Sequence, residues 1–152
     1  MKKTYSLLIF LFFTGLSFGQ NTIETDTKLI KNLITESFEE VFSGLNAKKM
    51  DKFYTNDFLL LENGVVQNKD SLSHYFNRAL QEKIIPKRIN TIEFIDVKIS
   101  KGMAWVAYQN HAVWKHEETV YGKAHWLESA TAIWTKEGWK LQMLHSTKVK
   151  IK

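Results

Sequence analysis

Apolar residues recur at spacings of three and four along residues 26–45, with charged residues between them. This spacing predicts an amphipathic helix with one broad apolar stripe. Gly44 and Asn46 interrupt the pattern, and Asn46 can cap a short second helix that carries Met50 and Phe53. The stripe of the first helix consists of Leu29, Ile30, Leu33, Ile34, Phe38, Val41, Phe42 and Leu45.

Two β-rich segments separated by Asn63-Gly64 follow the second helix. An Asn-Gly pair in this position predicts a tight hairpin, because both residues tolerate a positive φ. Asp70 or Ser71 can then cap a third helix. The apolar face of that helix consists of Leu72, Tyr75, Phe76, Ala79 and Leu80.

From Arg88 onward the apolar pattern has a period of two, which is typical of β-strands. We expect strands within residues 88–100, 103–116, 125–136 and 139–151. Helices followed by long strands predict an α+β fold. We expect three N-terminal helices packed on a curved antiparallel sheet, with a cone-shaped space between the two layers.

The beginning of the chain carries a different pattern. Two lysines precede an apolar run at residues 7–13, which is too short to span a bilayer, and Ser17 and Gly19 follow. This order is typical of a secretory signal peptide. We therefore expect cleavage after Gly19, a mature protein in the periplasm or outside the cell, and no stable membrane insertion.

Residues 20–152 are predicted to form a single domain, because no repeat or linker divides them. Loss of the two signal lysines reduces the formal net charge from +5 to +3. The lysines are scattered, and arginine occurs only at Arg78 and Arg88, so no nucleic-acid partner is expected. The chain has no cysteine, which excludes disulfides and thiolate chemistry.

Motifs for metals and cofactors are not found in the sequence. His111 and His116 are five residues apart on a predicted strand, so they point to opposite faces. No acidic cluster completes a ligand set with His125. A glycine-rich phosphate loop and a nucleophile elbow are also missing. We expect neither a metal site nor a cofactor.

Two segments resemble parts of the nuclear transport factor 2-like superfamily. Residues 45–64 (LNAKKMDKFYTNDFLLLENG) resemble its helix-turn-strand entry, and residues 131–147 (TAIWTKEGWKLQMLHST) resemble its last hairpin. The likeness is greatest to exported SnoaL-like members of unknown function and covers residues 20–152. It implies a cone-shaped fold, but the superfamily contains isomerases, cyclases, dehydratases and non-catalytic modules, so it assigns no reaction.

Ketosteroid isomerase is the member whose site can be compared residue by residue. Its oxyanion-donating tyrosine corresponds to Val41, which has no donor, and its general-base aspartate corresponds to Glu62. Its protonated aspartate corresponds to residues 129–134, which contain no acid. One match out of three does not support steroid isomerisation.

Glu62 is the first candidate catalytic residue. It shares a strand face with Phe58 and Leu60, so it points into the cone if Phe58 does. A carboxyl group in an apolar wall can take or give a proton near neutral pH. The alternative is a solvated acid beside the Asn63-Gly64 turn.

His145 is the second candidate catalytic residue, because strict alternation places it at the end of a buried strand face. Its predicted partner on the neighbouring strand is Ala130 or Ser129, depending on the turn, and the second register gives a polar cluster. The alternative is a histidine hydrogen-bonded inside the core. The residues that lead to it on the same face are Trp139, Leu141 and Met143.

We expect the cone to bind a small apolar or aromatic molecule, because such sites combine aromatic walls with few polar groups. The alternatives are a cofactor-independent isomerase, dehydratase or cyclase that uses Glu62, His145 or both, and a structural dimerisation module. The predicted ligand-binding residues are Tyr54, Trp105, His125, Trp126, Trp139 and Met143.

Residues 103–116 carry large side chains on both strand faces, with Trp105 on one face. One face can pack under the helices, and the other would then expose a large aromatic patch. We therefore predict a homodimer packed sheet to sheet. Its outward residues are expected to be Val106, Tyr108 and Trp114.

Overall fold

The computed structural model describes residues 18–150 of the 152-residue chain. The predicted signal peptide lies outside the described residues, except that the backbone of Phe18 and Gly19 belongs to the first helix. Among the described residues, no helix combines the length and apolar character needed to cross a membrane.

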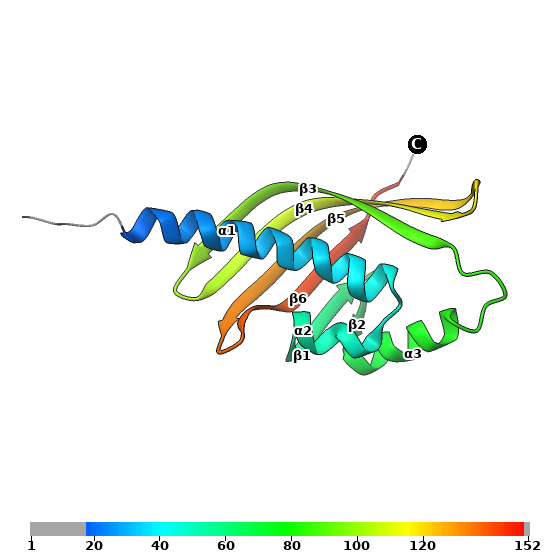
Figure 1. Ribbon diagram of the computed structural model, residues 1–152, viewed down its shortest axis with the longest axis horizontal. Coiled ribbons are helices and arrows are strands. Elements are labelled where there is room, and N and C mark those ends of the chain that lie inside the picture. Colours follow the sequence, from blue (N-terminus) through cyan, green and yellow to red (C-terminus); the bar gives the residue numbers. More distant parts are fainter. Residues whose placement is uncertain (1–17, 151–152) are drawn as a thin grey trace, which may run out of the picture.

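The first helix, α1 (Phe18–Ser37), runs across the sheet and continues into a π-helical segment, η1 (Phe38–Ser43), as Figure 1 shows. Its predicted stripe is confirmed except at Leu29, which is 45% exposed, because four of the other residues are at most 3% exposed. The helix ends at the predicted break, where Leu45 has a φ of 46°. The four buried stripe residues are Ile30, Ile34, Phe38 and Val41.

Two short helical segments follow, η2 (Ala47–Lys49) and α2 (Met50–Phe53). The Asn46 side chain accepts a hydrogen bond from the Lys48 N–H, so the predicted cap is confirmed. The longer α3 (Lys69–Ala79) begins after the first hairpin.

The prediction that Asp70 or Ser71 caps α3 is wrong. The cap is Asn68, whose side chain accepts a hydrogen bond from the Ser71 N–H and so satisfies a free donor of the first turn. The expectation of three N-terminal helices holds only in part, since only α1 is long and α3 follows two strands.

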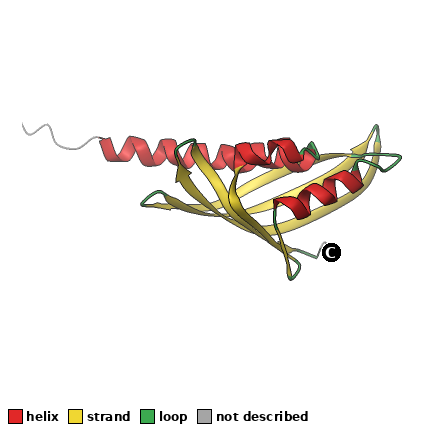
Figure 2. Cartoon of the chain, turned by 90° about the horizontal axis from the view of Figure 1, so that it is seen from below, coloured by secondary structure: helices red, strands yellow, loops and turns green. Residues whose placement is uncertain are grey.

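Six strands form one sheet in the order β2-β1-β6-β5-β4-β3, which curves around the helices (Figure 2). The prediction of a fully antiparallel sheet is wrong for one pair of strands, because β1 and β6 are parallel. The last strand of the β3–β6 meander returns beside β1 and runs in the same direction. The strand bounds are β1 (Tyr54–Glu62), β2 (Val65–Gln67), β3 (Lys87–Ser100), β4 (Met103–His116), β5 (Thr119–Thr135) and β6 (Gly138–Lys148).

The predicted hairpin at Asn63-Gly64 is confirmed. Asn63 and Gly64 have φ values of 52° and 76°, and the flanking Glu62 and Val65 are paired. Two consecutive positive φ values match the twist of the adjoining strands. The turn fixes the end of β1, and therefore the position of Glu62.

A β-bulge interrupts the alternation of β6. Ala132 pairs with Leu141 and Thr131 pairs with Met143, so Gln142 is the extra residue. After the bulge, Leu144 and Ser146 are the buried residues, at 1% and 5% exposed. His145 pairs with Ser129, which is one of the two predicted partners. The pair lies on the outer face of the sheet, however, and not on the buried face.

The inner and outer faces of β4 are the reverse of those that we expected when predicting the dimer. Val106 and Tyr108 are fully buried beneath the helices, and Trp114 is half-buried on the same inner face. The outer face carries Trp105, which is 45% exposed. The prediction that Val106, Tyr108 and Trp114 point outward is wrong, because α1 and η1 cover the face on which they lie.

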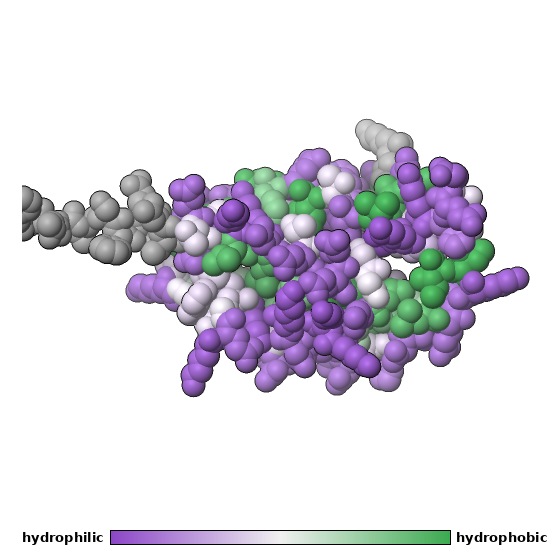
Figure 3. Space-filling model, in the orientation of Figure 1, coloured by the Kyte–Doolittle hydropathy of each residue, from purple (hydrophilic) through white to green (hydrophobic). Residues whose placement is uncertain are grey.

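The helical side of the molecule is mostly hydrophilic (Figure 3). Hydrophobic side chains gather at the end where α3 leads into β3. The exposed apolar residues of this connection include Leu80, Ile84 and Ile85.

Candidate functional site

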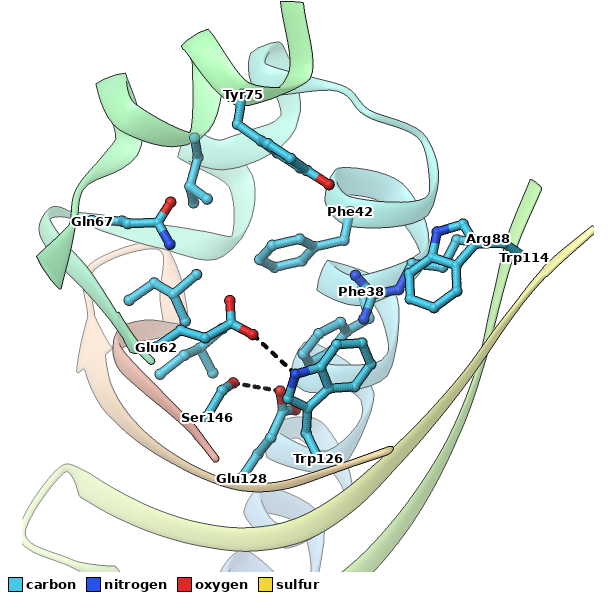
Figure 4. Close-up of a pocket in the computed structure, with 13 residues that line it drawn as sticks. Phe38, Phe42, Glu62, Gln67, Tyr75, Arg88, Trp114, Trp126, Glu128 and Ser146 are labelled. Carbon is cyan, nitrogen blue, oxygen red and sulfur yellow. Dashed lines mark hydrogen bonds between the residues drawn. The ribbon is translucent and has the colours of Figure 1, made fainter. Parts of the chain in front are cut away.

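A cavity of about 230 Å³ lies between η1, α3 and the inner face of the sheet (Figure 4). A cavity of about 150 Å³ holds benzene, so this one has room for a single substituted ring. A second cavity of about 200 Å³ shares a wall with it. The apolar lining of the first cavity is Phe38, Phe42, Leu60, Leu72, Trp114, Trp126 and Leu144, and its polar lining is Glu62, Gln67, Tyr75, Arg88, Glu128 and Ser146.

Glu128 of β5 is the most enclosed acid of the cavity, at 6% exposed. The Ser146 hydroxyl donates to its Oε1 at 2.5 Å, and the Asn110 amide donates to its Oε2 at 3.4 Å. Burial nevertheless raises the pKa of Glu128, and the donors Ser146, Tyr108 and Asn110, together with the charge of Arg88, offset only part of that effect.

Two buried tyrosines lie near this carboxyl group. Burial raises the pKa of both Tyr108 and Tyr54, and the Glu128 carboxylate raises each of them further. Neither hydroxyl makes a hydrogen bond of ordinary geometry among the described residues, but Tyr108 interacts with Glu128 and Tyr54 interacts with Ser37. Glu128 therefore belongs to a buried polar group that includes Tyr108.

Glu62 stands at the end of β1, half-buried in the cavity wall. Its Oε1 accepts a hydrogen bond of 2.9 Å from the Trp126 indole N–H (Figure 4). Phe58, which precedes it on the same strand face, is 1% exposed. The predicted orientation of Glu62 into the cone is therefore confirmed, and Trp126, one of the predicted ligand contacts, lines the same cavity.

Arg88, near the start of β3, places its guanidinium group against four aromatic rings. Its Nε donates to the Asn90 Oδ1 at 2.8 Å, and the Asn90 amide donates to the Ser43 hydroxyl. Burial lowers the pKa of Arg88, while Glu128 and Glu62 raise it. The distances from the guanidinium carbon to the ring centres are 5.1 Å for Trp126, 5.3 Å for Trp114, and 5.6 Å for Phe38 and Phe42.

The placement of His145 in the cavity is wrong. The Gln142 bulge places His145 on the exposed outer face of the sheet. The next residue, Ser146, points into the cavity instead. A bulge of this kind leaves no mark in the alternation of apolar and polar letters, because Met143 is apolar on either face.

Most other predicted ligand contacts also lie outside this cavity. Tyr54 is buried in the core against Phe58, with ring centres 4.1 Å apart. Trp139 donates to Asp26 of α1 at the other end of the molecule. The remaining three, Trp105, His125 and Met143, lie on the outer face of the sheet.

Two of the histidines contact one another on the outer face of the sheet. His125 bonds to Gln109 at 2.7 Å and stacks on His111, with ring centres 4.0 Å apart. Within the part of the chain that the structure describes, no group of three or more potential metal ligands is found.

Sequence reasoning missed Glu128, Arg88 and Ser146. The inward alternation from Trp126 through Glu128 to Ala130 contains the signal for Glu128, because an acid stands between two apolar residues. Glu128 lies one residue before residues 129–134, the segment that corresponds to the protonated aspartate of ketosteroid isomerase. Arg88 is one of only two arginines and begins an apolar strand, which could have marked it.

The sequence matches no known family, and no curated protein is a detectable relative. Solved structures do resemble the fold. A nuclear transport factor 2-like protein with a cystatin-like fold from Novosphingobium aromaticivorans superposes with a TM-score of 0.72 at 15% identity, over 91% of this chain and 94% of that one.

Two further structures agree with this comparison. A nuclear transport factor 2-like protein from Cytophaga hutchinsonii gives a TM-score of 0.60 at 13% identity, over 87% of this chain and all of its own. A ketosteroid isomerase-like protein from Erwinia carotovora atroseptica gives 0.59 at 15% identity, over 90% of this chain and all of its own. The chain therefore has the nuclear transport factor 2-like fold.

Proposed function

We propose that this protein binds a small apolar or aromatic molecule in the cavity between η1, α3 and the sheet. The observation that carries the proposal is the lining itself, in which five aromatic rings surround a space that also receives Glu62, Arg88 and Glu128. Such a combination of apolar walls and a few convergent polar groups is what small-molecule sites require.

Filling the cavity tests this proposal. Gln67 is half-buried at the cavity wall, so Gln67→Trp is expected to obstruct the space without disturbing the core. Val66 is 65% exposed and does not line the cavity, so Val66→Trp is the matched control. We expect benzyl alcohol to shift the Trp126 indole signal in NMR titrations of the wild type and of the control Val66→Trp, but not in those of Gln67→Trp. The proposal fails if the wild type shows no such shift.

A second candidate function is proton transfer without a cofactor, which the raised pKa of Glu128 favours. A protonated acid at the cavity can donate to a carbonyl oxygen while Glu62 removes a proton from the adjacent carbon. Acetophenone in heavy water is a suitable probe, because exchange of its methyl hydrogens reports this reaction. We expect exchange to be lost in both Glu62→Gln and Glu128→Gln if the protein is such an enzyme.

We also propose that the mature protein begins at Gln20 and is exported, since residues 1–19 have the pattern of a signal peptide. Intact-mass analysis of protein from the native envelope should show the loss of these residues. Recovery of the full-length mass there would contradict export with cleavage.

We also propose a homodimer packed sheet to sheet. Its interface is the outer face of the sheet, opposite to the face that carries Val106, Tyr108 and Trp114. The outer face of β4 and β5 carries apolar side chains that the helices do not cover. They include Met103, Trp105 and Leu127, which are 53%, 45% and 49% exposed.

A further inference from the structure

We propose that the molecule bound in this cavity carries a carboxylate group, and that Arg88 binds this group. The inference rests on the proposed function and names the class of ligand: a small organic acid with a single ring or a compact apolar body. The proposal combines three observations, which concern the partners of Arg88, the partners of the two acids and the shape of the cavity.

The first observation is that Arg88 is an enclosed cation without an ion-pair partner. Among the described residues its only hydrogen bond is the one from Nε to Asn90, and the ion pairs all involve lysines. The terminal nitrogens of the guanidinium group are therefore available as donors. Aromatic rings stabilise the cation through their faces, but they accept no strong hydrogen bond in its plane.

The second observation is that both acids of the cavity already have donors. Glu62 accepts from the Trp126 indole, and Glu128 accepts from Ser146 and Asn110. Neither carboxylate lies within ion-pair distance of Arg88, although both influence it through space. Arg88 is thus left with a desolvated charge, which a ligand anion can compensate.

The third observation is the direction of the guanidinium group. Figure 4 shows its nitrogens turned toward the space between Phe42 and Trp126, which is the interior of the cavity. The bond from Nε to Asn90 fixes one edge of the group. The opposite edge can donate two parallel hydrogen bonds to a carboxylate, while the rings contact the apolar body of the ligand.

Benzoate and benzamide form the decisive pair of probes, since they have nearly the same shape and differ in charge. We expect the wild-type protein to bind benzoate at least about tenfold more tightly than benzamide, because hydrogen bonds between charged groups are stronger than those to a neutral amide. NMR titration of the tryptophan indole signals measures both affinities, with Trp126 as the reporter inside the cavity and Trp105 as the reporter outside it.

The two arginines of the chain provide a matched set of variants. Arg88→Met should remove the preference for benzoate, and Arg88→Lys should retain only part of it, because an ammonium group cannot form the paired bonds. Arg78→Met removes the same charge from an exposed position of α3 outside the cavity and should bind benzoate as the wild type does.

The outcomes separate this inference from the proposed function. Equal binding of benzoate and benzamide by the wild type would overturn the role of Arg88 while leaving a neutral-ligand site in place. Failure of benzoate, benzamide and benzyl alcohol alike to shift the Trp126 signal would overturn both. Because the probe pair is compared on the wild type, this result does not depend on the folding of any variant.

Discussion

At the scale of single residues, Glu128 is a buried acid whose carboxyl group also lines the cavity. Most buried acids are paired with a cation, whereas the neighbours of this one are the neutral donors of Ser146, Tyr108 and Asn110. Such neutral donors stabilise a carboxylate less than an ion pair would, so burial determines the direction of the pKa change. A group in this state can donate a proton at a pH where an exposed glutamate is ionised.

The raised pKa predicts how stability depends on pH. Folded Glu128 holds its proton to a higher pH than the unfolded chain does, so folding takes up a proton in the window above the ordinary value of 4.5. The free energy of unfolding therefore falls as pH rises through that window, by about 1.4 kcal/mol for each unit of pKa elevation.

Glu128→Gln should remove this dependence, because the amide stays neutral. Asn110 has an unpaired Oδ1, which can accept from the new amide after the Asn110 side chain reorients. Urea unfolding at pH 5 and pH 8 measures the difference between variant and wild type, which should grow with pH. Glu93→Gln, at an exposed position of β3, is the control. A constant difference would contradict a raised pKa.

The orientation of Glu62 was predictable from the sequence, whereas that of His145 was not. Glu62 follows Phe58 and Leu60 on an unbroken stretch of β1, and His145 follows a bulge. Arg88 could not be assigned to a site in advance, because its four ring contacts come from η1, β4 and β5, which only the tertiary fold brings together.

At the scale of elements, the bulge in β6 determines which side chains reach the cavity. The extra residue, Gln142, reverses the faces of all residues that follow it, so Leu144 and Ser146 point inward. Without it, a single-residue slip would direct Met143 and His145 inward instead. The bulge is therefore the element that supplies the hydroxyl donor of Glu128.

Deletion of Gln142 should destabilise the protein by roughly 2–5 kcal/mol, the cost of displacing a buried leucine such as Leu144. The substitution Gln142→Ala keeps the bulge and loses only an exposed hydrogen bond to Asp57, so its cost should stay below about 1 kcal/mol. Chemical denaturation of both variants measures this contrast. Equal stability of the two would show that the bulge does not fix the inward face.

The elements themselves were largely predictable, and their pairing was not. The apolar spacing of α1 and the Asn63-Gly64 turn are local signals, and both predictions are confirmed. The parallel pairing of β1 with β6 joins residues such as Leu60 and Leu144, which are far apart in the sequence, and such a pairing leaves no local pattern.

At the scale of the whole molecule, the outer sheet face predicts association. Replacing both Trp105 and Leu127 by lysine should yield a folded monomer, because two charges would be buried without partners in the proposed interface. Leu80→Lys, on the exposed end of α3, should leave the dimer intact. Light scattering coupled to gel filtration measures the mass of each. A wild type that is monomeric at high concentration would contradict the proposal.

The tryptophans also give this molecule an optical consequence. Trp114 and Trp126 lie 6.1 Å apart at 68°, and Trp134 and Trp139 lie 5.5 Å apart at 74°, at the other end of the sheet. Indoles this close and inclined couple their electronic transitions, so each pair should contribute its own circular dichroism in the near ultraviolet. A molecule that enters the cavity touches only the first pair, and the second pair then serves as an internal reference within the same spectrum.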